Sequence, residues 1–387
     1  MDHHVLVTGA TGALGPYLLA EILQTEPAAI LDVLIRPPSE SLHTRWDSLL
    51  TRVREAGASH TDVNLERLRP LVGDICQPGL GINPADSRRL ARYTAGVVHA
   101  AADTRFRAPT DEQRQTNVEG TRILLDWAGQ CPGLQLFLMV STTCVAGNCS
   151  GPIPEDFLPE PAGFTNNYER TKWQAERLAK DSRLPVRVLR LSTALGSERT
   201  GAVYRQGALH HALRWFSRGL VPMVPGTADT PVDLISCETA SRLAARALAL
   251  PHAGFEVIHG AAGRRALPLG ELLGFVADYF KNRSVPWRRG QLDKPLIVDE
   301  STFQLFCRTI QQCQDALFSQ VLDSLNSFLP ALLHPKTYDT TRAEALWGGP
   351  LPLQNPKQTL ERVLDFCLDT SWGQREITGG RSWQVCN

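Results

Sequence analysis

Short apolar runs alternate with amphipathic stretches through the first part of the chain. The apolar runs lie at 4–8, 31–35, 68–73, 96–100 and 134–141. Several are apolar at consecutive rather than alternate positions, which is typical of strands buried on both faces of a parallel sheet. The amphipathic stretches predict helices near 14–24, 41–56, 85–93 and 111–130. Strand and helix repeated in this order predict an α/β fold built on a doubly wound, Rossmann-type parallel sheet.

The later part of the chain is richer in prolines and loops. We expect a helix at 167–181, strands at 186–191 and 255–260, and a helix after residues 230–236. Apolar residues also recur at helical spacing across 311–333, with a proline interrupting. They predict a helix packed on the body or lining a substrate pocket. A membrane-surface helix is disfavoured because the polar face carries Asp, Ser, Asn and Gln rather than Lys and Arg.

Charge, cysteine and histidine content narrow the class of partner. Forty basic and forty acidic residues cancel, so we expect a small-molecule partner rather than nucleic acid. Nine scattered cysteines without a Cys-x-x-Cys pair argue against a disulfide framework or a zinc site and for a reducing compartment. We interpret His210 and His211, on an expected helix, as ordinary, partly exposed residues, and expect no metal. With no basic leader and no run of about 18 apolar residues, we expect a cytoplasmic protein without a transmembrane segment.

A glycine-rich segment, TGATGALG, joins the first expected strand to the first expected helix. Its three glycines allow a tight turn, a close approach of the backbone to a pyrophosphate, and close packing of the helix on the sheet. The N-terminus of the helix supplies amide donors and the positive end of its dipole. The segment therefore predicts a dinucleotide site. The expected cofactor-binding residues are Thr8, Gly9, Thr11, Gly12, Ala13, Leu14 and Gly15.

The end of the second strand indicates which dinucleotide binds. NAD-preferring sites place a carboxylate there to bind the ribose 2′-hydroxyl, and a carboxylate would repel a 2′-phosphate. This chain has Arg36 at the strand end and Arg45 on the next helix. Guanidinium groups hold phosphate bidentately, so the cofactor is expected to be NADP(H). Asp32 is the counter-argument, but it lies early in the strand, where it should not reach the ribose. A solvated surface charge is the alternative interpretation of Arg36.

Two further strand ends add expected cofactor contacts. Asp74 and Ile75 follow the third strand, where an aspartate can accept a hydrogen bond from the adenine amino group. Ala100, Ala101 and Ala102 follow the fourth, where small side chains let the backbone lie against the cofactor. Each observation is weak alone, but their order on successive strands favours one nucleotide site.

Tyr168 and Lys172 lie four residues apart in the stretch NNYERTKWQAE and share one face of the expected helix. A nearby ammonium lowers the pKa of a phenol, so the tyrosine can exchange a proton near neutrality. The fifth strand ends in Ser141, Thr142 and Thr143, whose hydroxyls can hold a substrate oxygen. The four-residue spacing of a tyrosine and a lysine is common by itself. After a glycine-rich first turn and a fifth strand that ends in hydroxyl groups, it predicts a catalytic pair.

Together these motifs resemble the extended short-chain dehydrogenase/reductases. More narrowly, the chain is similar to the branch that contains the fatty acyl-CoA reductases (the male-sterility family) and the thioester reductase domains ending carboxylic acid reductases and some peptide or polyketide synthases. The resemblance covers about residues 1–280 and rests on TGATGALG, HAAADTRF, TNVEGT, VSTTCVAG and NNYERTKWQAE. The branch is indicated by AADTRF, Trp173, Glu176, SERTGAV and PVDLIS.

The resemblance implies roles for particular residues. Thr142 would be the hydroxyl partner because it stands five residues before Gly147, the register of the family's catalytic Ser or Thr. Thr143 is the fallback for that role. Tyr168 would be the general acid, and Lys172 its activator and a ligand of the nicotinamide ribose.

Asn117 and two departures from the family pattern complete the expected site. Asn117 matches the family asparagine that supports the active-site helix and a proton-relay water. Relatives often have Arg-Pro after the sixth strand, where this chain has Arg190 and Leu191, so we expect a different nicotinamide loop. Cys144 replaces a frequent aromatic. We interpret it as a buried small residue rather than a thiol nucleophile, because no histidine lies nearby in the sequence.

The resemblance implies an NADPH-dependent reductase whose substrate is an acyl thioester on coenzyme A or a carrier protein, with an aldehyde or alcohol as product. The alternatives are a ketone or hydroxysteroid-type dehydrogenase, an NAD-dependent sugar-nucleotide epimerase or dehydratase, and a non-enzymatic NADP(H)-sensing regulator. We expect an NADP-binding Rossmann domain at 1–200, a substrate-binding lobe interleaved with the main sheet at 201–372, and a flexible tail at 373–387. The sequence leaves the oligomeric state open.

Overall fold

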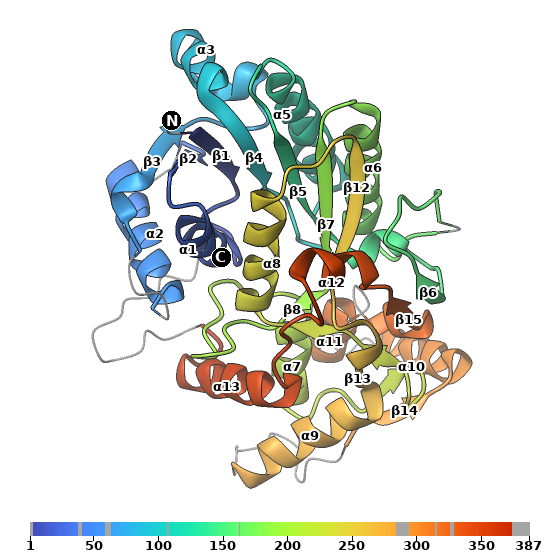
Figure 1. The fold of residues 1–387 in the computed structure, drawn as a ribbon. Helices are drawn as coiled ribbons and strands as arrows, with labels where there is room; N and C mark the ends of the chain where they lie inside the picture. The colour runs from blue at the N-terminus through green and yellow to red at the C-terminus, as the bar shows by residue number, and fades with distance from the viewer. Residues whose placement is uncertain are drawn as a thin grey trace.

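The computed structural model describes residues 3–37, 41–58, 63–106, 108–161, 163–283, 294–313, 316–325 and 329–373. The expected tail therefore lies outside the described residues, apart from Gly373. At the centre is a sheet of seven parallel strands in the order β12-β7-β5-β4-β1-β2-β3 (Figure 1). The predicted doubly wound α/β fold is confirmed. Its strands are β1 (His3–Thr8), β2 (Ala29–Ile35), β3 (Leu68–Val72), β4 (Thr94–His99), β5 (Leu136–Thr142), β7 (Val186–Leu191) and β12 (Phe255–Gly260).

Helices cover both faces of this sheet. One face carries α1 (Gly15–Thr25), α2 (Leu42–Ala56), α8 (Cys237–Ala249) and α12 (Thr341–Trp347). The other carries α3 (Pro84–Tyr93), α5 (Gly120–Ala128) and α6 (Asn167–Asp181). Val5 and Val7 belong to the core on the first face and Leu6 to the core on the second, and all three are buried. Burial on both faces is the reason the strands are apolar at consecutive positions.

The strand order reverses between β1 and β4. From β1 the sheet extends through β2 and β3 on one side and through β4, β5, β7 and β12 on the other. The loops after β1 and β4 therefore diverge and leave a crevice at the carboxyl ends of the strands, where open α/β sheets bind their ligands. The glycine-rich segment and Ala100 lie at this switch point.

A second group of elements lies beyond the carboxyl ends of the strands, below the sheet in Figure 1. Its helices are α7 (Ala208–Phe216), α9 (Leu269–Asn282), α10 (Glu300–Gln312), α11 (Ala316–Leu325) and α13 (Pro356–Asp369). They share an apolar core of their own. Four short strand pairs connect this part of the chain. They are β8 (Thr193–Ala194) with β11 (Leu234–Ile235), β10 (Pro231–Val232) with β13 (Leu267–Pro268), β9 (Met223–Pro225) with β14 (Leu296–Val298), and β6 (Gly151–Ile153) with β15 (Lys336–Tyr338).

Two expected helices are not continuous. The helix expected at 111–130 consists of α4 (Thr110–Arg114), a π-helical turn at Gln115–Glu119, and α5. The helix expected at 311–333 is divided in the described residues into the end of α10, α11 and a 3-10 turn at Leu329–Leu333. Pro330 falls in this last turn, where a residue without a backbone N–H is tolerated better than within an α-helix.

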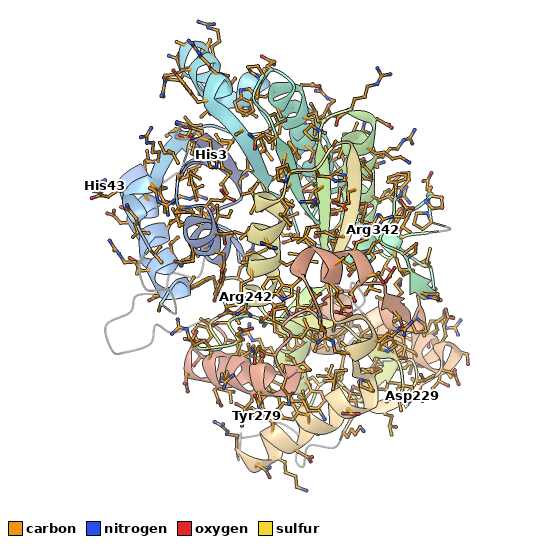
Figure 2. The ribbon with its side chains drawn as sticks, in the orientation of Figure 1. His3, His43, Asp229, Arg242, Tyr279 and Arg342 are labelled. Carbon is orange, nitrogen blue, oxygen red and sulfur yellow. The ribbon has the colours of Figure 1, made fainter. Side chains whose placement is uncertain are left out.

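Two carboxylates, one partly buried and one buried, form hydrogen bonds between the sheet with its helices and the later segments. Glu198, which follows β8, accepts a hydrogen bond from Arg242 of α8 at 2.8 Å. Glu155 accepts from the backbone N–H of His259 in β12 at 2.7 Å and also from the backbone N–H of Arg342 in α12. Arg242 and Arg342 mark the level at which the lower edge of the sheet meets the elements below it (Figure 2).

Candidate active site

A cleft of about 1950 Å³, including its open mouth, runs along the carboxyl ends of β1, β4, β5 and β7. The glycine-rich turn, the end of β5 and the start of α6 form one side, and α7 with residues 331–338 forms the other. Ten predicted site residues line it: Gly9, Gly12, Ala13, Leu14, Gly15, Ala100, Ala102, Thr142, Tyr168 and Lys172. The other eight lie outside its lining: Thr8, Thr11, Arg36, Arg45, Asp74, Ile75, Ala101 and Asn117.

The glycine-rich turn is shaped for a close ligand. Gly9 has a φ of 76°, and a Cβ there would lie 2.4 Å from the carbonyl carbon of Ala100. A Cβ on Gly15 would lie 2.0 Å from the backbone oxygen of Ala10, so this position needs glycine for packing. Gly12 instead faces the cleft, since its nearest contact beyond its chain neighbours would be the Gly9 oxygen at 3.2 Å. Leu14 at the N-cap of α1 makes no side-chain capping bond, so the turn and helix N-terminus fit a pyrophosphate.

Arginine approaches this turn from α2. The Nη2 atom of Arg45 donates a hydrogen bond to Thr11 Oγ1 at 3.4 Å, and Arg36 is exposed at the end of β2. The carboxylate of Asp32 is buried and lies 2.6 Å from His4 Nδ1. Asp32 is therefore engaged inside the sheet, whereas the guanidinium group of Arg45 reaches the glycine-rich turn from α2.

The other predicted cofactor residues outside the cleft brace its wall. Thr8 Oγ1 bonds His99 Nδ1 at 2.9 Å and accepts from the backbone N–H of Ala101 at 3.3 Å. Asp74 accepts from the backbone N–H two residues further on, at 2.9 Å. Ile75 is buried among the residues packed against α5. These contacts fix the ends of β1, β3 and β4.

Thr142 and Thr143 have different partners. The Thr142 hydroxyl is near enough to Tyr168 to lower the pKa of its phenol, and Thr142 Oγ1 accepts a hydrogen bond from the backbone N–H of Cys144 at 3.2 Å. The Thr143 hydroxyl instead acts on the pKa of Tyr338 of β15. The geometry thus brings Thr142, rather than its neighbour, to the tyrosine of α6.

Tyr168 is half-buried in the first turn of α6, with its ring centroid 5.5 Å from that of Phe106. Burial raises the pKa of its phenol, while the nearby Thr142 hydroxyl acts in the opposite direction. Lys172, one turn later, is buried and donates to the backbone oxygen of Val140 at 3.0 Å. The side chains of Thr142, Tyr168 and Lys172 therefore line one cleft.

Burial lowers the pKa of Lys172 to about 8, with Glu176 acting in the opposite direction. The ammonium is therefore charged below this pH and neutral above it. We expect kcat/KM to fall as the pH rises through about 8, since this profile reports groups of the free enzyme. Lys172→Arg should lower activity but remove that descending limb, because a guanidinium stays charged. Steady-state rates measured from pH 6 to 10 test this, and an unchanged limb in the variant would assign it to another group.

Helix α6, which carries Tyr168 and Lys172, is held by hydrogen bonds at its start and along its side. Its N-cap Asn166 accepts from the backbone N–H of Glu169 at 3.0 Å. Asn117, in the π-helical turn, donates to Thr171 Oγ1 at 3.0 Å and exchanges two hydrogen bonds with the backbone of Asp103. π-Helical turns often occur at functional sites, and here the turn carries the side chain that braces α6.

A buried ion pair lies directly behind the end of β5. Glu176 of α6 bonds Arg190 of β7 through three contacts between 2.7 and 3.1 Å, and neither side chain exceeds 1% exposure. Ser141 donates to the same carboxylate at 2.6 Å. The pair therefore connects α6, β5 and β7 at the point where the candidate catalytic residues emerge.

Sequence reasoning missed four residues of the cleft lining. Glu169 lies next to Tyr168 at the start of α6, whereas Arg205, Lys336 and Tyr338 come from segments without a motif. Burial raises the pKa of Glu169 to about 7, with Lys336 acting in the opposite direction. Only Glu169, next to Tyr168 in the quoted stretch, had a sequence signal that could have located it.

Cys144 and His210 also line the cleft. Burial raises the pKa of the Cys144 thiol to about 11, so it is protonated at neutral pH and is a poor nucleophile. His210 is buried rather than partly exposed as expected; its Nε2 lies 2.7 Å from the backbone oxygen of Leu195, while His211 is exposed.

Across the described ranges, no three His, Cys, Asp or Glu side chains form a group that could hold a metal. In the same part of the chain, no helix has the length and apolarity needed to cross a membrane.

A family model described as male sterility protein matches residues 7–244. This chain belongs to that family. The predicted resemblance to the male-sterility family is confirmed.

Relatives of this member of the male sterility family include an isonitrile lipopeptide synthase from Streptomyces coeruleorubidus, 32% identical over 241 residues that cover 60% of this chain and 16% of the relative. Fatty acyl-CoA reductase 2 from Mus musculus is 31% identical over 180 residues, covering 46% and 35%. The chain thus spans about a third or less of these two relatives. The solved terminal R domain from the myxalamid PKS-NRPS biosynthetic pathway has a similar fold, with a TM-score of 0.74 at 23% identity, covering 96% of this chain and 91% of that one.

Proposed function

We propose that this chain reduces acyl thioesters, carried by coenzyme A or by a carrier protein, to aldehydes or alcohols with NADPH. The observation that carries the proposal is that Thr142, Tyr168 and Lys172 line the same cleft as the glycine-rich turn, with the Thr142 hydroxyl near enough to lower the pKa of the Tyr168 phenol. Relatives named fatty acyl-CoA reductase and isonitrile lipopeptide synthase support the thioester as the reacting group.

The residues present fit a nicotinamide dinucleotide. Gly9, Gly12 and the start of α1 would hold its pyrophosphate, Arg36 and Arg45 its 2′-phosphate, and Lys172 the nicotinamide ribose. When bound, the reduced cofactor supplies a hydride. The chain's own groups must then place the acyl carbonyl between that site and Tyr168.

Thr142 and Tyr168 hold the carbonyl oxygen by hydrogen bonds at the end of β5. As hydride adds to the carbonyl carbon, Tyr168 transfers its phenolic proton to that oxygen, and the product is a hemithioacetal. The charged Lys172 stabilises the phenolate that forms. The hemithioacetal then loses its hydroxyl proton as the carbon–sulfur bond breaks, which releases an aldehyde and a thiol. A second hydride and proton would convert the aldehyde to an alcohol.

Arg45 is expected to set the cofactor preference. Arg45→Ala should lower the ratio of kcat/KM for NADPH over NADH roughly tenfold or more, because a hydrogen bond to a charged group contributes about 1.5–3 kcal/mol. Arg54→Ala is a matched control, since Arg54 is exposed near the end of the same helix. Initial rates with each cofactor test this. A preference equal in both variants would remove Arg45 from the 2′-phosphate site.

The proposal is tested by incubating the protein with NADPH and a panel of acyl-CoA and acyl-pantetheine thioesters. We expect NADPH oxidation matched by the release of one thiol per acyl group. Simple ketones and sugar nucleotides should not be turned over. Oxidation with ketones and none with thioesters would overturn the proposal, as would recovery of tightly bound NAD from the denatured protein.

A further inference from the structure

A second lysine, Lys336, lines the cleft in addition to Lys172. It lies at the start of β15, where the pairing with β6 places it opposite Gly151. The side chain is partly buried, and its Nζ donates a hydrogen bond to the backbone oxygen of His334 at 2.9 Å. An ammonium carries three N–H groups, so this bond leaves others that can face a ligand in the cleft.

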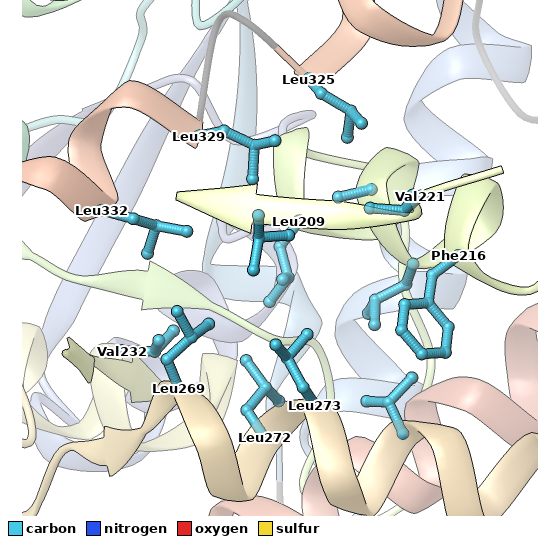
Figure 3. Close-up of a pocket in the computed structure, with 14 residues that line it drawn as sticks. Leu209, Phe216, Val221, Val232, Leu269, Leu272, Leu273, Leu325, Leu329 and Leu332 are labelled. Atoms are coloured by element: carbon cyan, nitrogen blue, oxygen red, sulfur yellow. The ribbon is translucent and has the colours of Figure 1, made fainter. Parts of the chain in front are cut away.

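The backbone that carries Lys336 is anchored on both sides. Before it, Leu329 and Leu332 are buried in the core of the lower group of helices, where Figure 3 shows them among other apolar side chains. After it, the ring of Tyr338 packs against that of His259 in β12, with centroids 5.7 Å apart. Lys336 therefore presents its flexible side chain to the cleft from a fixed strand.

Lys336 borders the same region of the cleft as Tyr168. Glu169 and Cys144 each act on the pKa of the Tyr168 phenol. The Lys336 ammonium in turn acts on the pKa of both Glu169 and Cys144. In a thioester the sulfur is bonded to the same carbon as the oxygen that Tyr168 would protonate. The sulfur of a bound substrate must therefore lie in this region as well.

Other titratable groups that line this region are poorer proton donors. Both carboxylate oxygens of Glu169 accept hydrogen bonds from the residues just before α6, at 2.8 and 3.2 Å. Burial raises the pKa of Tyr338 and of Cys144, so both hold their protons tightly. It lowers the pKa of His334, which leaves that imidazole largely neutral at pH 7. Burial also lowers the pKa of Lys336, which makes its ammonium a stronger acid than that of an exposed lysine.

We propose that Lys336 protonates the sulfur that leaves when the hemithioacetal collapses. The inference rests on the proposed thioester reduction and adds the residue that completes its second half. The hydroxyl proton of the hemithioacetal returns to the Tyr168 phenolate, and the electron pair it leaves forms the carbonyl bond of the aldehyde. The electron pair of the carbon–sulfur bond departs on sulfur, which takes a proton from the Lys336 ammonium. The neutral amine then regains a proton from water at the open mouth of the cleft.

The test compares two thioesters of the same acid in single turnovers of the full chain with saturating NADPH. Pantetheine is a poor leaving group without a proton, whereas para-nitrothiophenol has a low pKa and leaves readily as a thiolate. Lys336→Met should slow thiol release from the pantetheine thioester by about 10²-fold or more, the contribution of a positioned general acid. Release from the para-nitrophenyl thioester should stay within about threefold of the wild type.

Lys336→Arg separates proton transfer from charge. A guanidinium keeps the positive charge but does not give up its proton in proteins, so this variant should show the same selective loss. Release from the pantetheine thioester at the wild-type rate in Lys336→Arg would overturn the inference, because charge alone would then be enough. This variant also covers the case in which Lys336→Met does not fold.

Lys294→Met is the matched control. The Nζ of Lys294 also donates to a backbone oxygen, that of Gly270, at 2.9 Å, but this lysine is exposed and lies outside the cleft lining. Its variant should release both thiols at the wild-type rate. An equal loss with both thioesters in Lys336→Met would overturn the inference and leave the proposed function standing, since the lysine would then only position the substrate. Absence of turnover of either thioester by the wild-type chain would overturn the proposed function itself.

Discussion

Tyr168→Phe is expected to lower kcat for thioester reduction by about 10²–10⁴-fold, the contribution of a positioned general acid. The substitution removes one oxygen and leaves the ring and its contact with Phe106 in place. Thr142 would keep its bond from the backbone of Cys144, so the end of β5 should not move. Because the phenol proton is needed only as the carbonyl oxygen gains charge, KM for the thioester should change much less than kcat.

Tyr204→Phe is the control for loss of a largely buried phenol. Tyr204 packs against Tyr17 with ring centroids 5.4 Å apart and does not line the cleft. Its variant should cost a modest amount of stability and keep kcat within a factor of about two, since one lost hydrogen bond contributes about 1 kcal/mol. Single-turnover measurements of both variants with saturating NADPH separate chemistry from product release. A Tyr168→Phe protein retaining a tenth or more of wild-type kcat would show that another group donates the proton.

The sheet and the nucleotide turn were predictable because their signals are local. Consecutive apolar positions follow from burial on both faces, and the observed strand ends lie within two residues of the predicted ones. Gly9 is needed because its backbone lies against that of Ala100, at the end of the neighbouring strand. Gly15 is needed because the start of α1 packs against the backbone of Ala10. A pattern of this kind depends on neighbours in the sequence, so one sequence is enough to read it.

The π-helical turn and the second wall of the cleft depend on distant contacts. Residues 115–119 carry no local signal for an extra residue per turn, and the turn coincides with the bonds from Asn117 to Asp103 and Thr171. Lys336 and Tyr338 reach the cleft because β15 pairs with β6, almost two hundred residues earlier. Spacing within a sequence cannot show such a pairing.

Glu176 is another residue whose role depends on distant contacts and is visible only in the structure. Sequence reasoning used it only to indicate the branch and found no chemical role for it. In the structure its carboxylate bonds Ser141 and Arg190, and its charge acts on the pKa of Lys172. The departure at Arg190 and Leu191 thus lies next to the site, and Arg190 is the cation paired with this buried carboxylate.

Arg190→Leu is therefore expected to lower the free energy of unfolding by about 3–5 kcal/mol, the cost of leaving a buried charge without its partner. Both side chains are essentially unexposed, so water cannot replace the lost guanidinium. Replacing both residues, with Glu176→Leu added, should recover part of this stability because an apolar pair needs no partner. Some loss should remain, since Ser141 would lose the carboxylate to which it donates. Urea unfolding followed by circular dichroism measures each difference.

Arg122→Leu provides the matched control on the surface. Arg122 bonds Glu119 at 2.9 Å and Asp126 at 2.8 Å, but its side chain is 48% exposed. Exposed pairs contribute about 0.2–1 kcal/mol, so this variant should unfold close to the wild type. If Arg190→Leu and Arg122→Leu were equally stable, the pair would not hold α6 against β5 and β7. If instead the double variant were less stable than Arg190→Leu, the hydrogen bond from Ser141, rather than the charge pair, would be the main contribution of Glu176.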